Sequence, residues 1–300
     1  MPTVLLVRHG RTASNANGVL AGWTPGVSLD DTGRAQAGAL AQRMAVLPIA
    51  LAVSSPLQRC QETAKILLAE DGPEQHPRPE LLTDDRLGEC RYGDWTGKSL
   101  RDLAKEPLWR VVQMHPSAAV FPGEDGEAML TMQHRAVSAI REYDAKVAAE
   151  HGDDAIWIAL SHGDVIKAIL ADALGMHLDA FQRLVVDPCS VSVVRFTPLR
   201  PFAVRVNDSG NDLASLVPPP PKKRRAGTRR KPVSSDAVVG GSTGTSAASS
   251  NTSPSASPNT SPSTSPGRSA GPAKRASKRA SPRVSKRAST GGSASGPGTT

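Results

Sequence analysis

Short apolar runs alternate with amphipathic segments along the first two hundred residues of this chain. Continuous apolar runs of five or six residues are typical of strands that are buried on both faces. A turn around Pro198–Pro201 separates the last two runs, which predicts an antiparallel pair. The predicted strands are Thr3–Val7, Ile49–Val53, Leu81–Leu82, Ala155–Leu160, Val191–Phe196 and Phe202–Val206.

Helical spacing of apolar residues appears between these runs. Apolar residues from Ala37 to Met44 recur at helical spacing, and Asp30–Thr32 before them can cap a helix N-terminus. This pattern predicts a helix over 31–46. The Gly-rich stretches 15–28 and 84–97 are predicted loops. The alternation predicts an α/β fold, a three-layer sandwich with a mostly parallel central sheet. Further helices are predicted over 56–68, 98–115, 126–150 and 164–174.

The composition changes at about Pro218. From there onward the chain has no Phe, Trp or Tyr, and Ser, Pro, Gly, Ala, Lys and Arg dominate. Such a segment cannot bury enough apolar surface to offset its ordering entropy. We therefore predict one folded domain over 1–217 and a disordered basic tail over 218–300, in which Lys-Arg-Ala-Ser recurs three times and Ser-Pro five times.

The net charge of +8 is divided unevenly between these two parts. The tail carries 15 Lys or Arg and one acidic residue, Asp236, so its charge is +14, whereas 21 Lys or Arg against 27 Asp or Glu leave the folded part at −6. A basic tail without aromatic side chains predicts non-specific, salt-sensitive binding to nucleic acid or another anionic surface. The alternative is a dispensable, solubilising extension.

The cysteines and the N-terminus bear on the compartment. Cys60, Cys90 and Cys189 are odd in number and widely spaced, which favours a reducing environment. A predicted strand begins within three residues of Met1, so we expect no signal peptide, and no apolar stretch approaches the ~18 residues of a membrane span. We expect a cytoplasmic protein without a membrane span.

Three predicted strands end on polar groups of matching chemistry. The first ends on Arg8-His9-Gly10, the second on Ser54-Ser55-Pro56 with Arg59 shortly after, and the third on Ser161-His162-Gly163. Open α/β sheets bind ligands at the carboxyl ends of their strands, and helix N-termini add partial positive charge there. Two arginines and two histidines at one sheet edge predict a pocket for a phosphate dianion.

Together with further motifs, these strand ends resemble those of the histidine phosphatase superfamily, in its phosphoglycerate-mutase-like branch. The resemblance covers essentially all of 1–217 and is most similar to an actinobacterial phosphomutase and phosphatase group. It implies a phosphoglycerate-mutase-like fold. The matching pieces, in chain order, are Arg8-His9-Gly10 with Asn15, Ser54-Ser55-Pro56 with Arg59 and Thr63-Ala64, Leu87-Gly88-Glu89 with Tyr92 to Gly97, and Ser161-His162-Gly163.

The resemblance implies roles that elementary chemistry can check. His9 is implied to be the nucleophile that forms a phosphohistidine, so its imidazole must be neutral, and nearby cations favour that form. Glu89 is implied to be the general acid and base, which requires a pKa raised above the bulk ~4.3. His162 is expected to be protonated against the dianion. The implied phosphate ligands are Arg8, Asn15, Arg59, His162 and Gly163, with Arg8, Arg59 and His162 also counted as catalytic.

No Walker loop and no metal-spaced cluster occurs, and arginines can neutralise the phosphate, so we expect no metal and no cofactor. One stretch departs from the family. Pro122 to Glu127 lacks the serine that begins the following long helix in relatives; Asp125 is its predicted replacement as a cap. Glu124 and Asp125 are also expected to repel a second phosphate at the pocket mouth.

The sequence therefore predicts a phosphatase that hydrolyses a small phosphomonoester through a phosphohistidine. A phosphoglycerate-type mutase shares every catalytic group and is the alternative. A mutase needs extra cations for a second acidic group, and the cations in 98–130 have spacings that suit a solvated helix face. A third alternative is a binding or tethering protein that acts through its basic tail.

Overall fold

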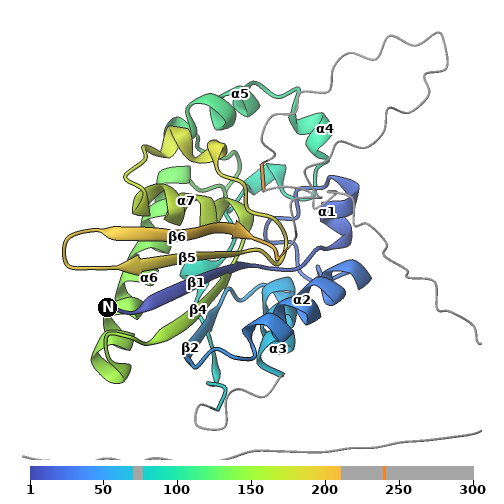
Figure 1. The fold of residues 1–300 in the computed structure, drawn as a ribbon. Coiled ribbons are helices and arrows are strands. Elements are labelled where there is room, and N and C mark those ends of the chain that lie inside the picture. The colour runs from blue at the N-terminus through green and yellow to red at the C-terminus, as the bar shows by residue number, and fades with distance from the viewer. Residues whose placement is uncertain (70–76, 211–238, 241–300) are drawn as a thin grey trace, which may run out of the picture. The chain divides into compact units, whose positions relative to one another are not determined.

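The computed structural model describes residues 1–69, 77–210 and 239–240 (Figure 1). Its centre is a sheet of six strands in the order β3-β2-β4-β1-β5-β6. The four strands from β3 to β1 pair in parallel, whereas β5 and β6 are antiparallel additions at one edge. The strands are β1 (Thr3–Arg8), β2 (Ile49–Ser54), β3 (Leu81–Thr83), β4 (Ile156–Ser161), β5 (Val191–Phe196) and β6 (Pro201–Asp208).

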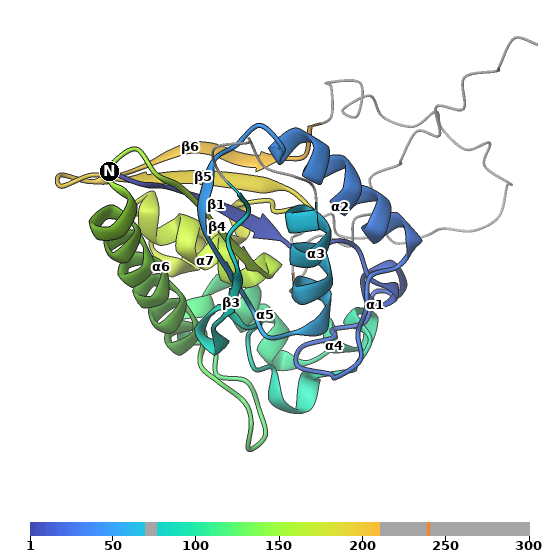
Figure 2. The same cartoon turned by 90° about the horizontal axis from the view of Figure 1, so that it is seen from below.

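Helices cover both faces of this sheet, so the predicted three-layer α/β sandwich is confirmed (Figures 1 and 2). Side chains alternate along β1: Leu5 and Val7 pack with α2 and α3, whereas Val4 and Leu6 belong to the core beneath α6 and α7. This alternation places one apolar core on each side of the sheet. The covering helices are α2 (Asp31–Met44), α3 (Gln58–Ala69), α6 (Met129–His151) and α7 (Gly163–Ala173).

The register of the three central strands aligns their carboxyl ends. Arg8 of β1 pairs with Ser161 of β4, and Ser54 of β2 pairs with Leu160 of β4. The alignment continues past the strands, because the His9 amide donates to the Ser161 carbonyl at 3.1 Å. Residues that follow these three strands therefore lie at the same edge of the sheet.

The predicted strands and the helices α2, α3 and α7 are confirmed within a few residues. The predicted loop 15–28 differs at its start, where the structure has a short helix, α1 (Ala13–Asn17). A capping box between Thr12 and Asn15 begins this helix. Gly18 ends this helix in the left-handed region, at φ +64°. This short helix has no buried residue and hence no apolar stripe that periodicity could detect.

The region 98–130 differs in two ways. The predicted helix 98–115 is two helices, α4 (Leu100–Leu103) and α5 (Pro107–Met114), because Pro107 cannot donate a hydrogen bond inside a continuous helix. The long helix α6 starts at Met129 with Ala128 as its N-cap, so the predicted cap by Asp125 is wrong. Asp125 lies in the turn that precedes the helix instead.

Most of the predicted tail, 218–300, lies outside the described residues. The exceptions are Val239 and Gly240, and these two differ from the expectation of a disordered extension. Val239 is 1 % exposed and belongs to the same apolar cluster as Val4 and Leu6. Within the part of the chain that the structure describes, no helix is both long and apolar enough to cross a membrane.

Candidate active site

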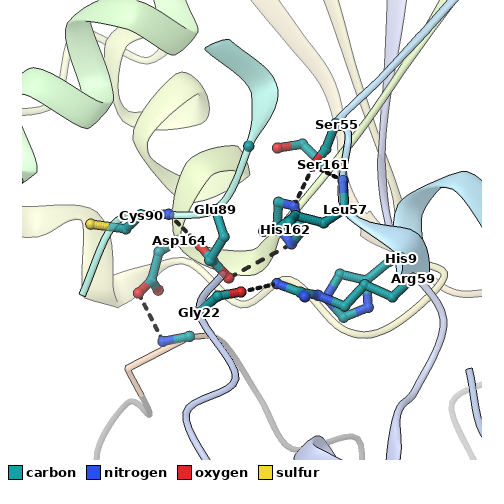
Figure 3. Close-up of polar contacts among 12 residues, drawn as sticks. His9, Gly22, Ser55, Leu57, Arg59, Glu89, Cys90, Ser161, His162 and Asp164 are labelled. Atoms are coloured by element: carbon teal, nitrogen blue, oxygen red, sulfur yellow. Dashed lines mark hydrogen bonds and ion pairs between the residues drawn. The ribbon is translucent and has the colours of Figure 1, made fainter. Parts of the chain in front are cut away.

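The site lies at the aligned strand ends, where the sequence predicted it (Figure 3). His9 follows β1, His162 follows β4, and Arg59 lies in the first turn of α3 after β2. The His9 and His162 rings have centroids 5.2 Å apart, and the Arg59 Nε lies 3.3 Å from the His9 Nε2. Glu89 reaches the same cluster from the loop after β3, with its Oε2 3.8 Å from the His162 Nδ1.

The hydrogen bonds of His9 define its tautomer. Its Nδ1 lies 2.7 Å from the carbonyl oxygen of Gly10, which can only accept, so Nδ1 carries the proton. The lone pair of the neutral ring is then on Nε2, which accepts from the Arg59 Nε–H. Burial first, and then the charges of Arg59 and Arg8, lower the pKa of His9 well below 6.5. The predicted neutral imidazole is confirmed, with burial as the larger cause.

The loop after His9 is held by local contacts. The Gly10 amide donates to the Thr63 Oγ1 at 3.0 Å, and the Thr63 hydroxyl donates to the Arg59 carbonyl at 2.7 Å. A Cβ at position 10 would lie 2.7 Å from the Gly33 carbonyl oxygen at the start of α2. Glycine is required here because α2 approaches the loop so closely. These contacts join β1, α2 and α3 around His9.

Two guanidinium groups are buried beside the histidines. Arg8 is fully buried and donates from Nη1 to the Val186 carbonyl at 2.7 Å. Arg59 is 2 % exposed and donates from Nη2 to the Gly22 carbonyl at 2.9 Å. Buried cations require partners or a bound anion. Two buried cations therefore lie beside the histidines in a domain whose net charge is negative.

His162 is fully buried. Its Nε2 is 2.8 Å from the Ser55 hydroxyl, which connects the ends of β4 and β2. Burial, followed by the charges of Arg59, His9 and Arg8, lowers the pKa of His162 well below 6.5. The predicted protonated form is therefore opposed by the protein's own groups, because the cations that keep His9 neutral act on His162 as well.

Glu89 is 4 % exposed, and its Oε1 accepts from the Cys90 amide at 3.0 Å. Burial, and after it the charge of Asp164, raises the pKa of Glu89 from 4.5 to about 7. The charges of Arg59 and Arg8 act in the opposite direction. The expected upward shift is confirmed. A carboxyl group with this pKa can both donate and accept a proton near neutrality.

Sequence reasoning missed the residues that hold Glu89 in place. Arg135 of α6 donates to the carbonyl oxygens of residues 86, 88 and 89 at 2.7, 2.9 and 3.0 Å. Its guanidinium also forms an ion pair with Glu127 at 2.6 Å. On the other side of the loop, the Trp23 Nε1 donates to the Glu89 carbonyl at 2.6 Å. No sequence signal connects an arginine in a long helix to carbonyl groups more than forty residues away.

The remaining predicted site residues, Asn15 and Gly163, have other contacts. Asn15 accepts from both the backbone amide and the hydroxyl of Thr12 through its Oδ1, at 3.1 and 2.9 Å, as part of the α1 capping box. Gly163 is the first residue of α7, directly after His162. The Gly163 amide therefore lies at the N-terminus of α7, which is the positive end of the helix dipole. Among the described residues, no group of three or more His, Cys, Asp or Glu is placed to hold a metal ion.

A cavity of about 470 Å³ adjoins the site. Trp23 and Tyr92 connect the two, because the Trp23 indole donates to Glu89 and the Tyr92 hydroxyl to the Asp164 Oδ2 at 2.8 Å. The Arg91 guanidinium lies 4.1 Å above the Trp23 ring. Three carboxylates line the cavity together with this one cation. The lining residues are Trp23, Thr24, Pro25, Arg91, Tyr92, Gly93, Asp94, Thr96, Glu124 and Asp125.

Comparison with known proteins agrees with this geometry. The model of the histidine phosphatase superfamily (branch 1) matches residues 4–209, and the chain belongs to this superfamily. Its members among the relatives below are phosphatases or mutases, so the chain is an enzyme of the phosphatase or mutase type.

Three similar proteins illustrate this range. A 2,3-bisphosphoglycerate-dependent phosphoglycerate mutase of Gloeobacter violaceus is 26% identical over 63% of this chain and 83% of its own length. A protein of Schizosaccharomyces pombe named as a probable phosphatase is 32% identical over 55% of this chain and 70% of its own. The structure of a phosphoserine phosphatase of Entamoeba histolytica has a TM-score of 0.60 at 21% identity, over 69% of this chain and 98% of its own, and shares the fold.

Proposed function

We propose that the protein hydrolyses a small phosphomonoester through a phosphohistidine formed on Nε2 of His9. The observation that carries this proposal is the pairing of two protonation states in one buried cluster. The imidazole of His9 is neutral with its lone pair on Nε2, and Glu89 has a pKa of about 7. A nucleophile ready to attack and an acid ready to donate are what the first chemical step needs.

In the first step, the His9 Nε2 attacks phosphorus and the bond between phosphorus and the ester oxygen breaks. The leaving oxygen takes the proton of Glu89, so an alcohol departs. In the second step, Glu89 accepts a proton from water as the water oxygen attacks the phosphohistidine. The N–P bond breaks, inorganic phosphate leaves, and His9 returns to the neutral form that still carries a proton on Nδ1.

Arg8, Arg59 and His162 are the proposed ligands of the phosphoryl oxygens, with Asn15 and the Gly163 amide at the rim. A guanidinium can hold two oxygens at once, and fixed cations stabilise the charge that spreads over the oxygens in the transition state. The dianion also adds negative charge next to His162, which favours the protonation of its imidazole during binding.

The cavity beside the site favours a phosphatase over the mutase alternative. Asp94, Glu124 and Asp125 line it together with the single cation Arg91. A phosphoglycerate-type mutase must hold a second acidic group of its substrate while the phosphoryl group is transferred back, and three carboxylates disfavour that group. The mutase reading is supported by the names of relatives such as the Gloeobacter violaceus mutase.

The decisive experiment is a screen of the purified full-length chain against phosphorylated metabolites without added metal. We expect release of phosphate from small monoesters and an acid-labile phosphoryl label on His9. The His9→Ala variant is the control and should show neither. Unchanged hydrolysis in that variant would contradict the proposal. A stable phosphoenzyme that transfers its group between phosphoglycerate positions, with little free phosphate, would favour the mutase.

We further propose a cytoplasmic location and an electrostatic role for the tail. Cys60, Cys90 and Cys189 are all free and buried, in keeping with a reducing compartment. The +14 charge of residues 218–300 supports non-specific binding of nucleic acid or another anionic surface. Full-length protein should bind a mixed-sequence duplex with an affinity that falls steeply with salt; binding that is insensitive to salt would contradict an electrostatic role.

A further inference from the structure

Residues Val239 and Gly240 pack against the catalytic centre, although thirty residues (209–238) separate them from the end of β6 in the sequence. The Gly240 amide donates to the Asp164 Oδ2 at 2.8 Å, and the Arg8 Nη2 donates to the Gly240 carbonyl at 3.3 Å. One glycine thus has both of its polar backbone groups bound by charged side chains of the site. Val239 beside it is 1 % exposed.

The groups that bind this glycine are themselves buried. Arg8 and Asp164 are fully buried, and Asp164 Oδ2 also accepts from the Tyr92 hydroxyl at 2.8 Å. Buried charged groups with fixed partners form a rigid receptor that recognises one donor and one acceptor. Both bonds are made to backbone atoms, so the choice of residue at this position depends on the backbone conformation and on the space around it.

The sequence of the segment fits this receptor. Gly240 has φ +82°, and a Cβ there would lie 3.0 Å from the Leu20 Cδ1. Both the left-handed backbone and the close approach favour glycine. Val239 supplies the apolar anchor in a tail that has only four branched aliphatic residues after Pro218, namely Val233, Val238, Val239 and Val284. Burial of one valine side chain is a substantial gain for an otherwise polar segment.

We propose that Val239–Gly240 is an intramolecular ligand of the active site, which binds Arg8 and Asp164 through its backbone and must leave Arg8 before a substrate phosphate binds there. This inference rests on the proposed function in its assignment of Arg8 to the phosphate. The Gly240 carbonyl occupies one N–H of the guanidinium to which the phosphate is assigned, so the two ligands compete for Arg8. The segment then inhibits the enzyme that carries it, and a partner that captures Val239–Gly240 would activate it.

The first test measures competition without turnover. Hydrogen exchange of the full-length chain should show a protected Gly240 amide, because it donates to a buried carboxylate. Inorganic phosphate at saturating concentration should remove this protection, while amides of the central strands remain protected. A Gly240 amide that exchanges as fast as that of Gly292, or one whose protection is unaffected by bound phosphate, would overturn the proposal.

The second test measures activity with p-nitrophenyl phosphate. Gly240→Val and, separately, Val239→Asp should lower KM by about tenfold. Each variant displaces the segment and so increases the fraction of sites that are open to substrate, which raises the apparent affinity. Gly292→Val and Val284→Asp are matched controls and should leave KM unchanged. A KM that is unchanged in both test variants, or a loss of kcat in both, would overturn the proposal, the latter because the segment would then complete the site.

The two tests also separate this inference from the proposed function. If the Gly240 amide is protected and phosphate releases it, but no monoester is hydrolysed by any variant, the competition stands and the proposed hydrolysis is wrong. If hydrolysis proceeds and depends on His9, but the Gly240 amide is never protected, the hydrolysis stands and the intramolecular ligand is wrong.

Discussion

The catalytic centre and the cavity beside it are built in opposite ways. In the centre, His9 and His162 are buried and follow paired strands, so backbone hydrogen bonds of the sheet fix their positions. In the cavity, Arg91, Glu124 and Asp125 are exposed and lie in loops. The centre is cationic and the cavity is mainly acidic. The comparison suggests that the sheet fixes the chemistry, whereas the loops select the substrate.

The strongest test of the centre is the removal of its nucleophile. His9→Ala should lower kcat by on the order of 10⁴-fold or more, as expected for loss of a covalent nucleophile. Steady-state hydrolysis of p-nitrophenyl phosphate and phosphoryl labelling measure the effect. His134→Ala changes an exposed histidine on α6 and is the matched control. Retention of a tenth of the activity in His9→Ala would mean that another group attacks phosphorus.

Glu89→Gln should lower kcat by about 10³-fold on an alkyl phosphate, within the range for loss of general acid–base catalysis. The effect on p-nitrophenyl phosphate should be smaller in the first step, because nitrophenolate leaves without a proton. Single-turnover rates on the two substrates measure this difference. Equal losses on both substrates would assign Glu89 a role other than proton donation.

The raised pKa of Glu89 also predicts a dependence of stability on pH. Its pKa is raised from 4.5 to about 7, so the native state holds this proton more tightly than the unfolded chain does. The stabilisation is therefore present below pH 4.5 and is lost as the pH rises through about 7. Relative to Glu89→Gln, the wild type should lose about 3 kcal/mol of unfolding free energy over this range, at ~1.4 kcal/mol per pKa unit. Urea unfolding at pH 4.5 and 8 measures it, and parallel pH profiles for the two proteins would contradict the shift.

The sequence predicted the residues of the catalytic centre better than the residues that pack around it and hold it in place. His9 and His162 were found because each follows an apolar run, and a parallel sheet brings such strand ends together. The contacts of Arg135 depend on how α6 packs against a loop far away in the chain, and a helical pattern gives no such register. Val239 and Gly240 were missed for a different reason, because the composition of a long segment conceals a short buried piece within it.

Arg135 tests whether those supports matter to the centre. Arg135→Met should lower kcat by about 10- to 100-fold, because it releases three carbonyl groups of the Glu89 loop and small displacements of a catalytic group are costly. Arg135→Lys should restore part of the rate. Arg141→Met on the same helix, whose exposed pair with Asp172 contributes little, is the control. If the apparent pKa of Glu89 in the pH profile is the same in Arg135→Met and the wild type, Arg135 does not position Glu89.

The smallest effects are expected in the cavity, where they distinguish binding from chemistry. Glu124→Gln combined with Asp125→Asn removes two of the three carboxylates that line it. KM for a substrate with a second acidic group, such as 3-phosphoglycerate, should fall by about threefold, as expected for exposed charges. KM for p-nitrophenyl phosphate and kcat for both substrates should remain unchanged, because the reacting groups lie in the buried centre. Glu150→Gln, at an exposed position on α6, is the control. A fall in KM that is equal for both substrates would mean that these carboxylates act on the phosphate pocket itself, and the separation between a centre that reacts and a cavity that selects would be wrong.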